Sequence, residues 1–163
     1  MTRLHSYDTV VTWTGDRGTG TSGYRDYGRE HEVTAEGPAP IAGSADPAFR
    51  GDPARWNPEQ LLLAALAQCH MLSYLALCAR HGVVVTGYVD HAHGTMAQEG
   101  EGGRFTSAVL RPTVRVASPA MLEKAVALHH DAHASCFIAS SVNFPVTHEP
   151  TVTADDAQPA PRG

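Results

Sequence analysis

The feature that most constrains this chain of 163 residues is a long apolar run in its middle third. Nearly every residue from Leu61 to Ala79 is apolar, and Arg80-His81-Gly82 then supplies residue types that end helices. Just ahead of the run, Asn57 is a favoured N-cap, Pro58 suits the first helical position, and Gln60 completes a capping-box pattern. The sequence therefore predicts one long helix.

A helix that is apolar on every side is either buried in protein or spans a membrane. Nineteen residues from Leu61 to Ala79 would just cross a bilayer. However, Gln68, Cys69, His70 and Ser73 lie at the middle of the run, and no other segment resembles a membrane span. We therefore expect a buried central helix and no membrane partner.

The rest of the chain reads mainly as strands, because apolar and polar residues alternate with the period of a half-buried sheet. A second helix is expected from Ser118 to about His133, and Pro112 should place its strand at an edge or break it in two. The expected strands are Thr9–Trp13, Val83–Met96, Ala108–Val116 and Val142–Val146. This order of elements predicts an α+β fold built around the buried helix.

No repeat or change in composition marks a domain boundary, so residues 1–150 are expected to form a single domain. Residues 151–163 are rich in Ala, Pro and Asp and are predicted to be a flexible C-terminal tail. Gly37–Trp56 is an unusually long Gly- and Pro-rich segment, and its apolar residues suggest that it packs against the domain.

Charge and cysteine content exclude several classes of protein. Twelve Lys and Arg against seventeen Asp and Glu give a net charge of −5, so no basic excess is available to bind nucleic acid. Three cysteines are too few, and odd in number, for a secreted disulfide framework. The first residues lack the apolar core of a signal peptide. A cytoplasmic location is therefore expected, where thiols stay reduced.

The three cysteines differ in their surroundings. Cys69 lies near the middle of the apolar run between Gln68 and His70, and polar neighbours there indicate that a cavity or an interface opens at this point. Cys78 lies nine residues later, on the opposite face of the helix, and is expected to pack in the core. Cys136 follows the second helix.

Two segments resemble the OsmC/Ohr family of organic hydroperoxide reductases. Asn57-Pro58-Glu59-Gln60-Leu61 followed by Ala65 to Cys69 is similar to the family's NPEEL…AACF helix. Ala132-His133-Ala134-Ser135-Cys136 resembles its second-cysteine segment, and Trp13-Thr14-Gly15 its first strand. The family often has Pro where Phe137 stands and an apolar residue where His70 stands.

This resemblance implies an OsmC-like fold, with antiparallel sheets wrapped around a long buried central helix, and an intertwined homodimer. It implies a thiol-dependent peroxidase without a cofactor, active in oxidative-stress defence, that reduces organic hydroperoxides to alcohols. Cys69 would attack the peroxide and Cys136 would resolve it as an intramolecular disulfide. A dithiol reductant, lipoyl-type or another small thiol, would restore both thiols.

The family also places an Arg, held by the Glu of the NPE motif, beside the reactive cysteine. Glu59 matches that Glu. Arg50 is our preferred match for the Arg, with Arg17 and then Arg55 as alternatives. An apolar pocket for the substrate is expected to be lined by residues that share bulk and apolar character, namely Phe49, Trp56, Met71, Tyr74 and Phe137.

Helix geometry adds an inference to the site that the resemblance implies. Ten residues of straight helix separate Glu59 from Cys69 by about 15 Å, so the two cannot share a site within one helix. If two copies of the helix packed antiparallel about a dyad near Ala64 or Ala65, Glu59 of one chain would approach Cys69 of the other.

Two alternatives remain open at this level. His129, His130, His133 and Cys136 have a spacing that could bind a metal ion, and His91 and His93 add a further pair. The same fold could also form a non-catalytic dimer that binds a hydrophobic ligand.

Overall fold

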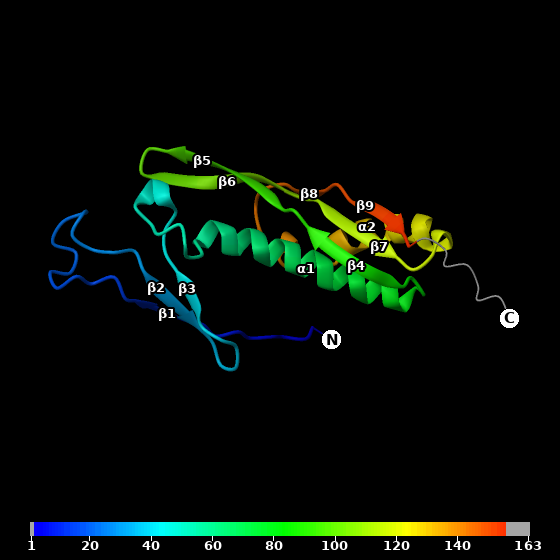
Figure 1. The fold of residues 1–163 in the computed structure, drawn as a ribbon, viewed down its shortest axis with the longest axis horizontal. Coiled ribbons are helices and arrows are strands. Elements are labelled where there is room, and N and C mark those ends of the chain that lie inside the picture. Colours follow the sequence, from blue (N-terminus) through cyan, green and yellow to red (C-terminus); the bar gives the residue numbers. More distant parts are fainter. Residues whose placement is uncertain (1, 156–163) are drawn as a thin grey trace. The chain divides into compact units, whose positions relative to one another are not determined.

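The structure is a computed structural model that describes residues 2–155 (Figure 1). Contacts divide the chain into two compact units, the first ending at Leu62 and the second beginning at Leu63. This boundary falls inside the long helix α1, Pro58–Arg80. No signal in the sequence marked it, and a single domain over residues 1–150 stays a prediction.

The first unit contains a three-stranded antiparallel sheet in the order β1-β2-β3, with β1 at Val10–Trp13, β2 at His31–Thr34 and β3 at Ile41–Gly43. A short 3-10 helix follows at Pro47–Phe49. Gly37–Trp56 thus contains regular structure where a long loop was predicted. The predicted buried face of β1 is wrong for the isolated chain, because all four of its residues are exposed.

The residues that the first unit buries are small or polar. Among residues 2–62, none of the buried positions holds a large apolar side chain; they are Gly15, Gly28, Gly43, Ser44 and Asn57. Trp13 illustrates the consequence, since it stays 45% exposed although its indole N–H donates to the Gly28 carbonyl at 2.8 Å. A three-stranded sheet needs an apolar face packed on something to be stable. The first unit therefore lacks a hydrophobic core of its own.

The predicted start and end of α1 are confirmed. The Asn57 side chain accepts from the Gln60 backbone N–H at 2.8 Å, and the Gln60 side chain accepts from the Asn57 backbone N–H at 3.2 Å, which is the reciprocal pattern of a capping box. At the other end Gly82 has φ of 73°, and the next N–H, of Val83, donates to the Cys78 carbonyl at 2.9 Å. This left-handed glycine ends the helix.

Only one stripe of α1 is fully buried, whereas burial on all sides was predicted. Its buried residues recur every four positions: Leu66, His70, Tyr74 and Cys78. The opposite face is exposed, and Leu72 on that face retains 62% of its accessible surface. By length and composition α1 could cross a bilayer, but its buried stripe contributes to the protein core in both hydrophobic clusters.

The second unit contains two three-stranded sheets, ordered β4-β7-β9 and β5-β6-β8. Their strands are β4 Val85–Asp90, β5 His93–Glu99, β6 Gly102–Leu110, β7 Pro112–Val116, β8 Val146–His148 and β9 Thr151–Ala154. Each sheet combines one antiparallel pair with one parallel pair. The sheets are therefore mixed, where purely antiparallel sheets were expected.

Several strand boundaries differ from the predictions. Val83–Met96 is divided between β4 and β5, and Pro112 breaks its segment into β6 and β7, because proline lacks the N–H that would continue the ladder. The strand predicted at Val142–Val146 begins only at Val146. The predicted tail is wrong for Thr151–Ala154, which pair in parallel with β7; residues 156–163 of that tail lie outside the described residues.

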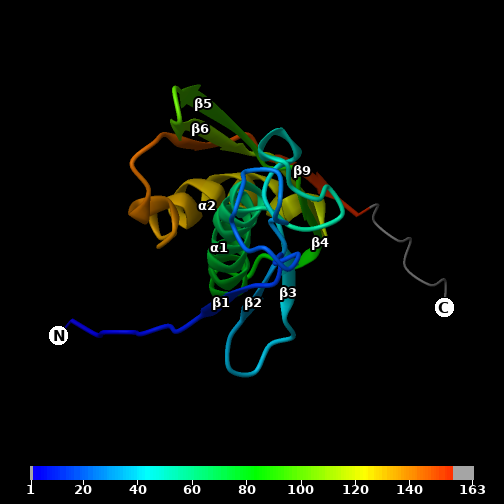
Figure 2. The same cartoon turned by 90° about the vertical axis from the view of Figure 1, so that its left-hand side faces the viewer.

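The second helix, α2, spans Leu122–Ala134 and follows a 3-10 turn at Pro119–Met121. Figure 2 looks along α1 and shows α2 beside it. The larger core cluster joins the two helices to β7 through fully buried side chains, including Tyr74, Val114 and Leu128. A smaller cluster joins Leu66 of α1 to Ala108 and Leu110 of β6. This packing fixes α1 against α2 and positions the site described next.

Candidate active site

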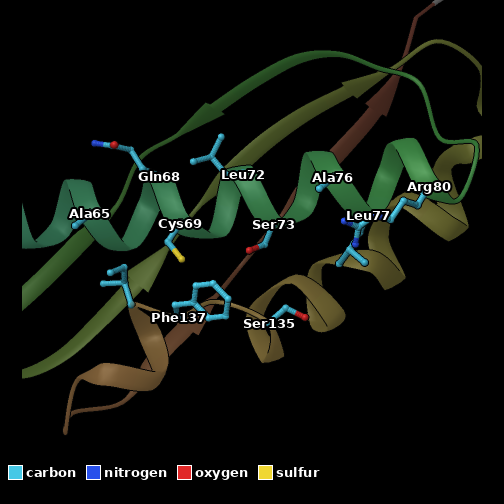
Figure 3. A pocket seen from close by; sticks show the side chains of 11 residues that line it. Ala65, Gln68, Cys69, Leu72, Ser73, Ala76, Leu77, Arg80, Ser135 and Phe137 are labelled. Carbon is cyan, nitrogen blue, oxygen red and sulfur yellow. The ribbon is translucent and has the colours of Figure 1, made fainter. Parts of the chain in front are cut away.

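A cavity of about 660 Å³ lies along α1 in the second unit (Figure 3). The sulfur of Cys69 points into the space between α1 and the segment that carries Phe137. Most of the lining is apolar or small, and it consists of Ala65, Gln68, Cys69, Leu72, Ser73, Ala76, Leu77, Arg80, Ser135, Phe137 and Ile138. The predicted cavity at Cys69 is therefore present.

Cys136 lies directly beside this cavity but is buried, with 1% of its surface exposed. It follows Ser135, the C-cap of α2, and its N–H donates to the His133 carbonyl at 3.2 Å. Its sulfur accepts from the Ala139 N–H at 3.4 Å, and Cys69 lies near enough to affect its pKa. The structure thus brings together the two cysteines that the sequence singled out, as free thiols.

Burial controls the acidity of Cys136. Desolvation is the largest influence, the neighbouring Cys69 thiol adds to it, and together they raise the pKa of the Cys136 thiol to about 11. Cys136 is therefore a protonated thiol at neutral pH that can donate to the Cys69 sulfur. The two sulfurs thus differ in environment: Cys69 is half-buried and lines the cavity, whereas Cys136 is enclosed.

The third thiol, Cys78, packs in the larger core cluster with 1% exposure, as predicted. Burial raises the pKa of this thiol as well. It does not line the cavity with Cys69, because nine residues of helix place the two on different faces.

Of the side chains predicted to line the apolar pocket, Phe137 does so and is 79% exposed at the cavity. Met71 and Tyr74 do not line it. Met71 is two positions from Cys69, about 200° around the helix. Tyr74 is fully buried and donates to the Ala125 carbonyl at 3.1 Å. The prediction for these two residues was wrong because it did not consider on which face of the helix each side chain lies.

Phe49 and Trp56 belong to the first unit. Phe49 is half-buried and ends the 3-10 helix. Trp56 is 51% exposed, and its backbone bridges to β3 through bonds with Ala42 and Ser44. Their role in substrate binding stays a prediction.

Glu59 lies in the first turn of α1, and its Oε2 is buried without a hydrogen-bond partner. The predicted partner Arg50 is exposed and closes the 3-10 helix in a left-handed conformation, with φ of 66°. Arg55 pairs with Asp52 at 3.7 Å instead, and Arg17 is exposed. Within residues 2–62 the structure therefore leaves the Glu59 carboxylate without the Arg that the resemblance implies.

A cluster of four histidines, which lies on a different face of α1 from Cys69, was not predicted. His70 and His129 are both fully buried, their rings are nearly parallel, and His70 Nε2 lies 3.0 Å from His129 Nδ1. His148 lies 5.6 Å from His70 between ring centroids, and His133 lies 5.2 Å from His148. The polar His70 within an apolar helix and the i, i+4 pair His129 and His133 were the available signals.

Burial lowers the pKa of three of these imidazoles. Burial, together with the neighbouring His148 and His133, lowers the pKa of His70 to about 4. Burial, His70 and His148 lower the pKa of His129 to about 3, and burial also lowers that of His148. His70 Nδ1 and His129 Nε2 have no hydrogen-bond partner.

The metal alternative is not supported by this arrangement. Across residues 2–155 no three His, Cys, Asp or Glu side chains are grouped so as to hold a metal ion. The four residues considered face different partners: His129 bonds to His70, His133 packs against His148, Cys136 lies beside Cys69, and His130 is exposed. Zinc would need their donor atoms to converge.

A family model described as OsmC-like protein matches residues 51–151 of this chain. The chain belongs to the OsmC family. The match includes α1, both predicted redox cysteines and α2, so the resemblance read from the NPE and cysteine motifs is confirmed together with the OsmC-like fold.

Solved structures agree with this assignment. An OsmC-like protein of unknown function from Vibrio cholerae is 32% identical, with a TM-score of 0.80 over 90% of this chain and 99% of that one. Organic hydroperoxide resistance proteins from Elizabethkingia anophelis and Legionella pneumophila are each 16% identical, with TM-scores of 0.67 and 0.63. These two cover 95% and 93% of this OsmC chain and 100% and 99% of their own. A comparison with curated proteins gave no match.

Proposed function

We propose that this OsmC protein is a thiol-dependent peroxidase that reduces organic hydroperoxides to alcohols. The observation that carries the proposal is the pair of neighbouring free thiols, in which Cys69 lines a largely apolar cavity and Cys136 is buried beside it. A peroxidase of this kind needs one accessible attacking sulfur and one resolving sulfur within reach.

The reaction proceeds in two thiol steps. The Cys69 thiolate attacks a peroxide oxygen, the S–O bond forms as the O–O bond breaks, and the alkoxide takes a proton to leave as alcohol. Cys69 is then a sulfenic acid. The Cys136 sulfur displaces the hydroxyl, which leaves with the Cys136 proton as water, and the Cys69–Cys136 disulfide forms. A dithiol reductant, lipoyl-type or another small thiol, returns both residues to thiols by exchange.

The cavity favours a substrate with an organic substituent. Leu72, Leu77, Phe137 and Ile138 give it apolar walls beside the Cys69 sulfur, so an alkyl or aryl group is transferred there from water with a gain in free energy. Hydrogen peroxide has no such group. Discrimination in favour of organic hydroperoxides follows from this difference.

A homodimer accounts for three features that one chain leaves unexplained. The first unit has no hydrophobic core, the Leu72 face of α1 is exposed, and Glu59 has a buried oxygen without a partner. Antiparallel packing of two α1 helices would bring Glu59 of one chain towards Cys69 of the other. Arg50 is the proposed cation for this composite site, with Arg17 as the alternative, because Arg55 is already paired with Asp52.

Two structural relatives are organic hydroperoxide resistance proteins, which supports the same function. Three free thiols suit a reducing compartment, so a cytoplasmic location is part of the proposal. The second candidate is a dimer that binds a hydrophobic ligand without chemistry. The size and apolar lining of the cavity favour it equally.

One experiment separates the two candidates. The reduced protein is mixed with one equivalent of cumene hydroperoxide, and thiols, disulfides and cumyl alcohol are then quantified by mass spectrometry. We expect a Cys69–Cys136 disulfide and one equivalent of alcohol. Cys69→Ser should give neither, and Cys136→Ser should stop at the sulfenic acid. The matched Cys78→Ser variant should behave like wild type. Unchanged thiols in the wild type would contradict the peroxidase and leave the ligand-binding candidate.

A further inference from the structure

We propose that His70 and His129 are positioning residues, whose hydrogen bond holds α1 and α2 in the register at which Cys69 and Cys136 form a disulfide. The inference deepens the proposed peroxidase, since disulfide formation is its second step. It concerns a part of the molecule that does not line the cavity.

The two helices that carry the thiols are joined by two side-chain hydrogen bonds in the described part of the second unit. One is His70 Nε2 to His129 Nδ1 at 3.0 Å, and the other is Tyr74 Oη to the Ala125 carbonyl at 3.1 Å. From the first bond to the second, the α1 partner moves four residues forward, from His70 to Tyr74. The α2 partner moves four residues back, from His129 to Ala125, so the helices run antiparallel. Each bond is one helical turn from the other.

The histidine bond is the one nearer the thiols. His70 is adjacent to Cys69 in α1, and His129 lies two helical turns before Cys136. Cys136 is tied to the end of α2, since its N–H donates to His133 and the C-cap N–H of Ser135 donates to Asp131 and Ala132. A displacement of α2 along α1 would therefore move the Cys136 sulfur by the same amount.

Disulfide formation tolerates little displacement, because the two sulfurs must approach to about 2.05 Å with their Cα atoms about 4.4–6.8 Å apart. Apolar side chains between two helices resist separation but supply little directional preference. A hydrogen bond between buried rings depends on both distance and angle, and breaking it leaves polar nitrogens without water. The ring of Tyr74, stacked on His129 at 3.9 Å, limits the rotation of that imidazole further.

The charge state of the pair suits this role. Burial and the neighbouring imidazoles keep the pKa values of His70 and His129 at about 4 and about 3. Both rings are therefore neutral at physiological pH, so one N–H donates to one bare nitrogen and no like-charge repulsion separates the helices. Either ring can be the donor in this bond.

The test is the equilibrium between the protein dithiol and glutathione, which needs no peroxide. In the double variant His70→Leu with His129→Leu both polar partners are removed, so the fold should be retained while the register is no longer fixed. We expect the equilibrium constant for the Cys69–Cys136 disulfide to fall at least tenfold, which corresponds to a reduction potential about 30 mV less negative.

Two control sets separate positioning from stability. Gln and Asn amides can stand in for Nε2 and Nδ1 respectively, so His70→Gln with His129→Asn should stay within about threefold of wild type. Leu128→Ala lowers stability by removing a fully buried side chain of the same core but leaves the histidine bond, and it should leave the equilibrium constant unchanged. Thermal melting of all variants checks that each is folded.

The inference is overturned if the double leucine variant has the wild-type equilibrium constant, or if Leu128→Ala shifts it as strongly. Failure of the proposed function gives a different result. In that case cumene hydroperoxide would leave the thiols unchanged, while the glutathione equilibrium would still depend on His70 and His129.

Discussion

The Cys136 thiol is a close neighbour of Cys69, yet only Cys69 lines the cavity. Reactivity towards a soluble alkylating agent should follow this difference. With its pKa raised to about 11, Cys136 is a thiolate to only about one part in a thousand at pH 8. We expect iodoacetamide to modify Cys69 first and to leave Cys136 and Cys78 unmodified.

The measurement is peptide mapping after a short incubation with the reduced protein. Denaturation in urea serves as the control and should make all three thiols react at similar rates. Modification of Cys136 or Cys78 ahead of Cys69 in the folded protein would show that the cavity does not give access to Cys69.

The exposed face of α1 should determine the oligomeric state. Leu72 is 62% exposed in the single chain, and the proposed dimer would bury it. Leu72→Glu should place unpaired charges in that interface and convert the dimer to a monomer, as measured by light scattering coupled to gel filtration. Val126→Glu on α2, at a position 50% exposed, is the matched control and should remain dimeric. A wild-type protein that is monomeric at micromolar concentration would contradict the proposed assembly.

Acid should destabilise the protein through its buried histidines. An unfolded histidine has a pKa of 6.5, whereas His70 and His129 titrate at about 4 and about 3 in the folded chain. The unfolded chain therefore binds more protons below pH 6.5. The stability contribution is fully present above pH 6.5, declines as the pH falls below 6.5, and is lost once the pH has fallen through about 4 for His70 and about 3 for His129. The decline is at most about 1.4 kcal/mol per pH unit for each imidazole.

Urea unfolding measured between pH 7.5 and pH 4.5 tests this dependence. The variant that combines His70→Gln with His129→Asn has no titrating group at these positions, so its stability should vary less with pH over the same range. An identical pH dependence in the two proteins would assign acid sensitivity to other groups.

Phe137 should affect the choice of substrate. Its ring lines the cavity and is 79% exposed, so Phe137→Ala removes apolar surface with little effect on folding. If the proposed peroxidase activity is present, kcat/KM for cumene hydroperoxide should fall by about three- to tenfold, whereas that for hydrogen peroxide should change less than twofold. Val126→Ala, outside the cavity, controls for the loss of an exposed apolar side chain. Equal losses with both peroxides would show that the ring does not contact the substituent.

Local sequence rules predicted the elements whose structure depends on neighbouring residues. The boundaries of α1 were predicted because Asn57, Gln60 and Gly82 act within one turn of the helix ends. The break at Pro112 follows from the same kind of local chemistry. The strand β9 was missed because Thr151–Ala154 depends on pairing with β7, which is far away in the sequence.

The candidate site, like the fold, was predicted in part. The polar break in an apolar helix singled out Cys69, whereas its pairing with Cys136 came from the resemblance to the OsmC/Ohr family; Phe137 was also identified as a lining residue. The error at Met71 and Tyr74 came from ignoring helical rotation. The His70–His129 bond spans 59 residues, and His148 comes from a separate strand, so no local pattern could have joined them.

The lack of a hydrophobic core in the first unit limits when this unit can fold during synthesis. Residues 2–62 leave the ribosome before the segments that contain the buried apolar side chains. Their β-sheet therefore has no apolar surface of its own to fold onto during early synthesis. If a second chain supplies the missing surface, as in the proposed dimer, the final folding step of this unit should become faster as protein concentration rises.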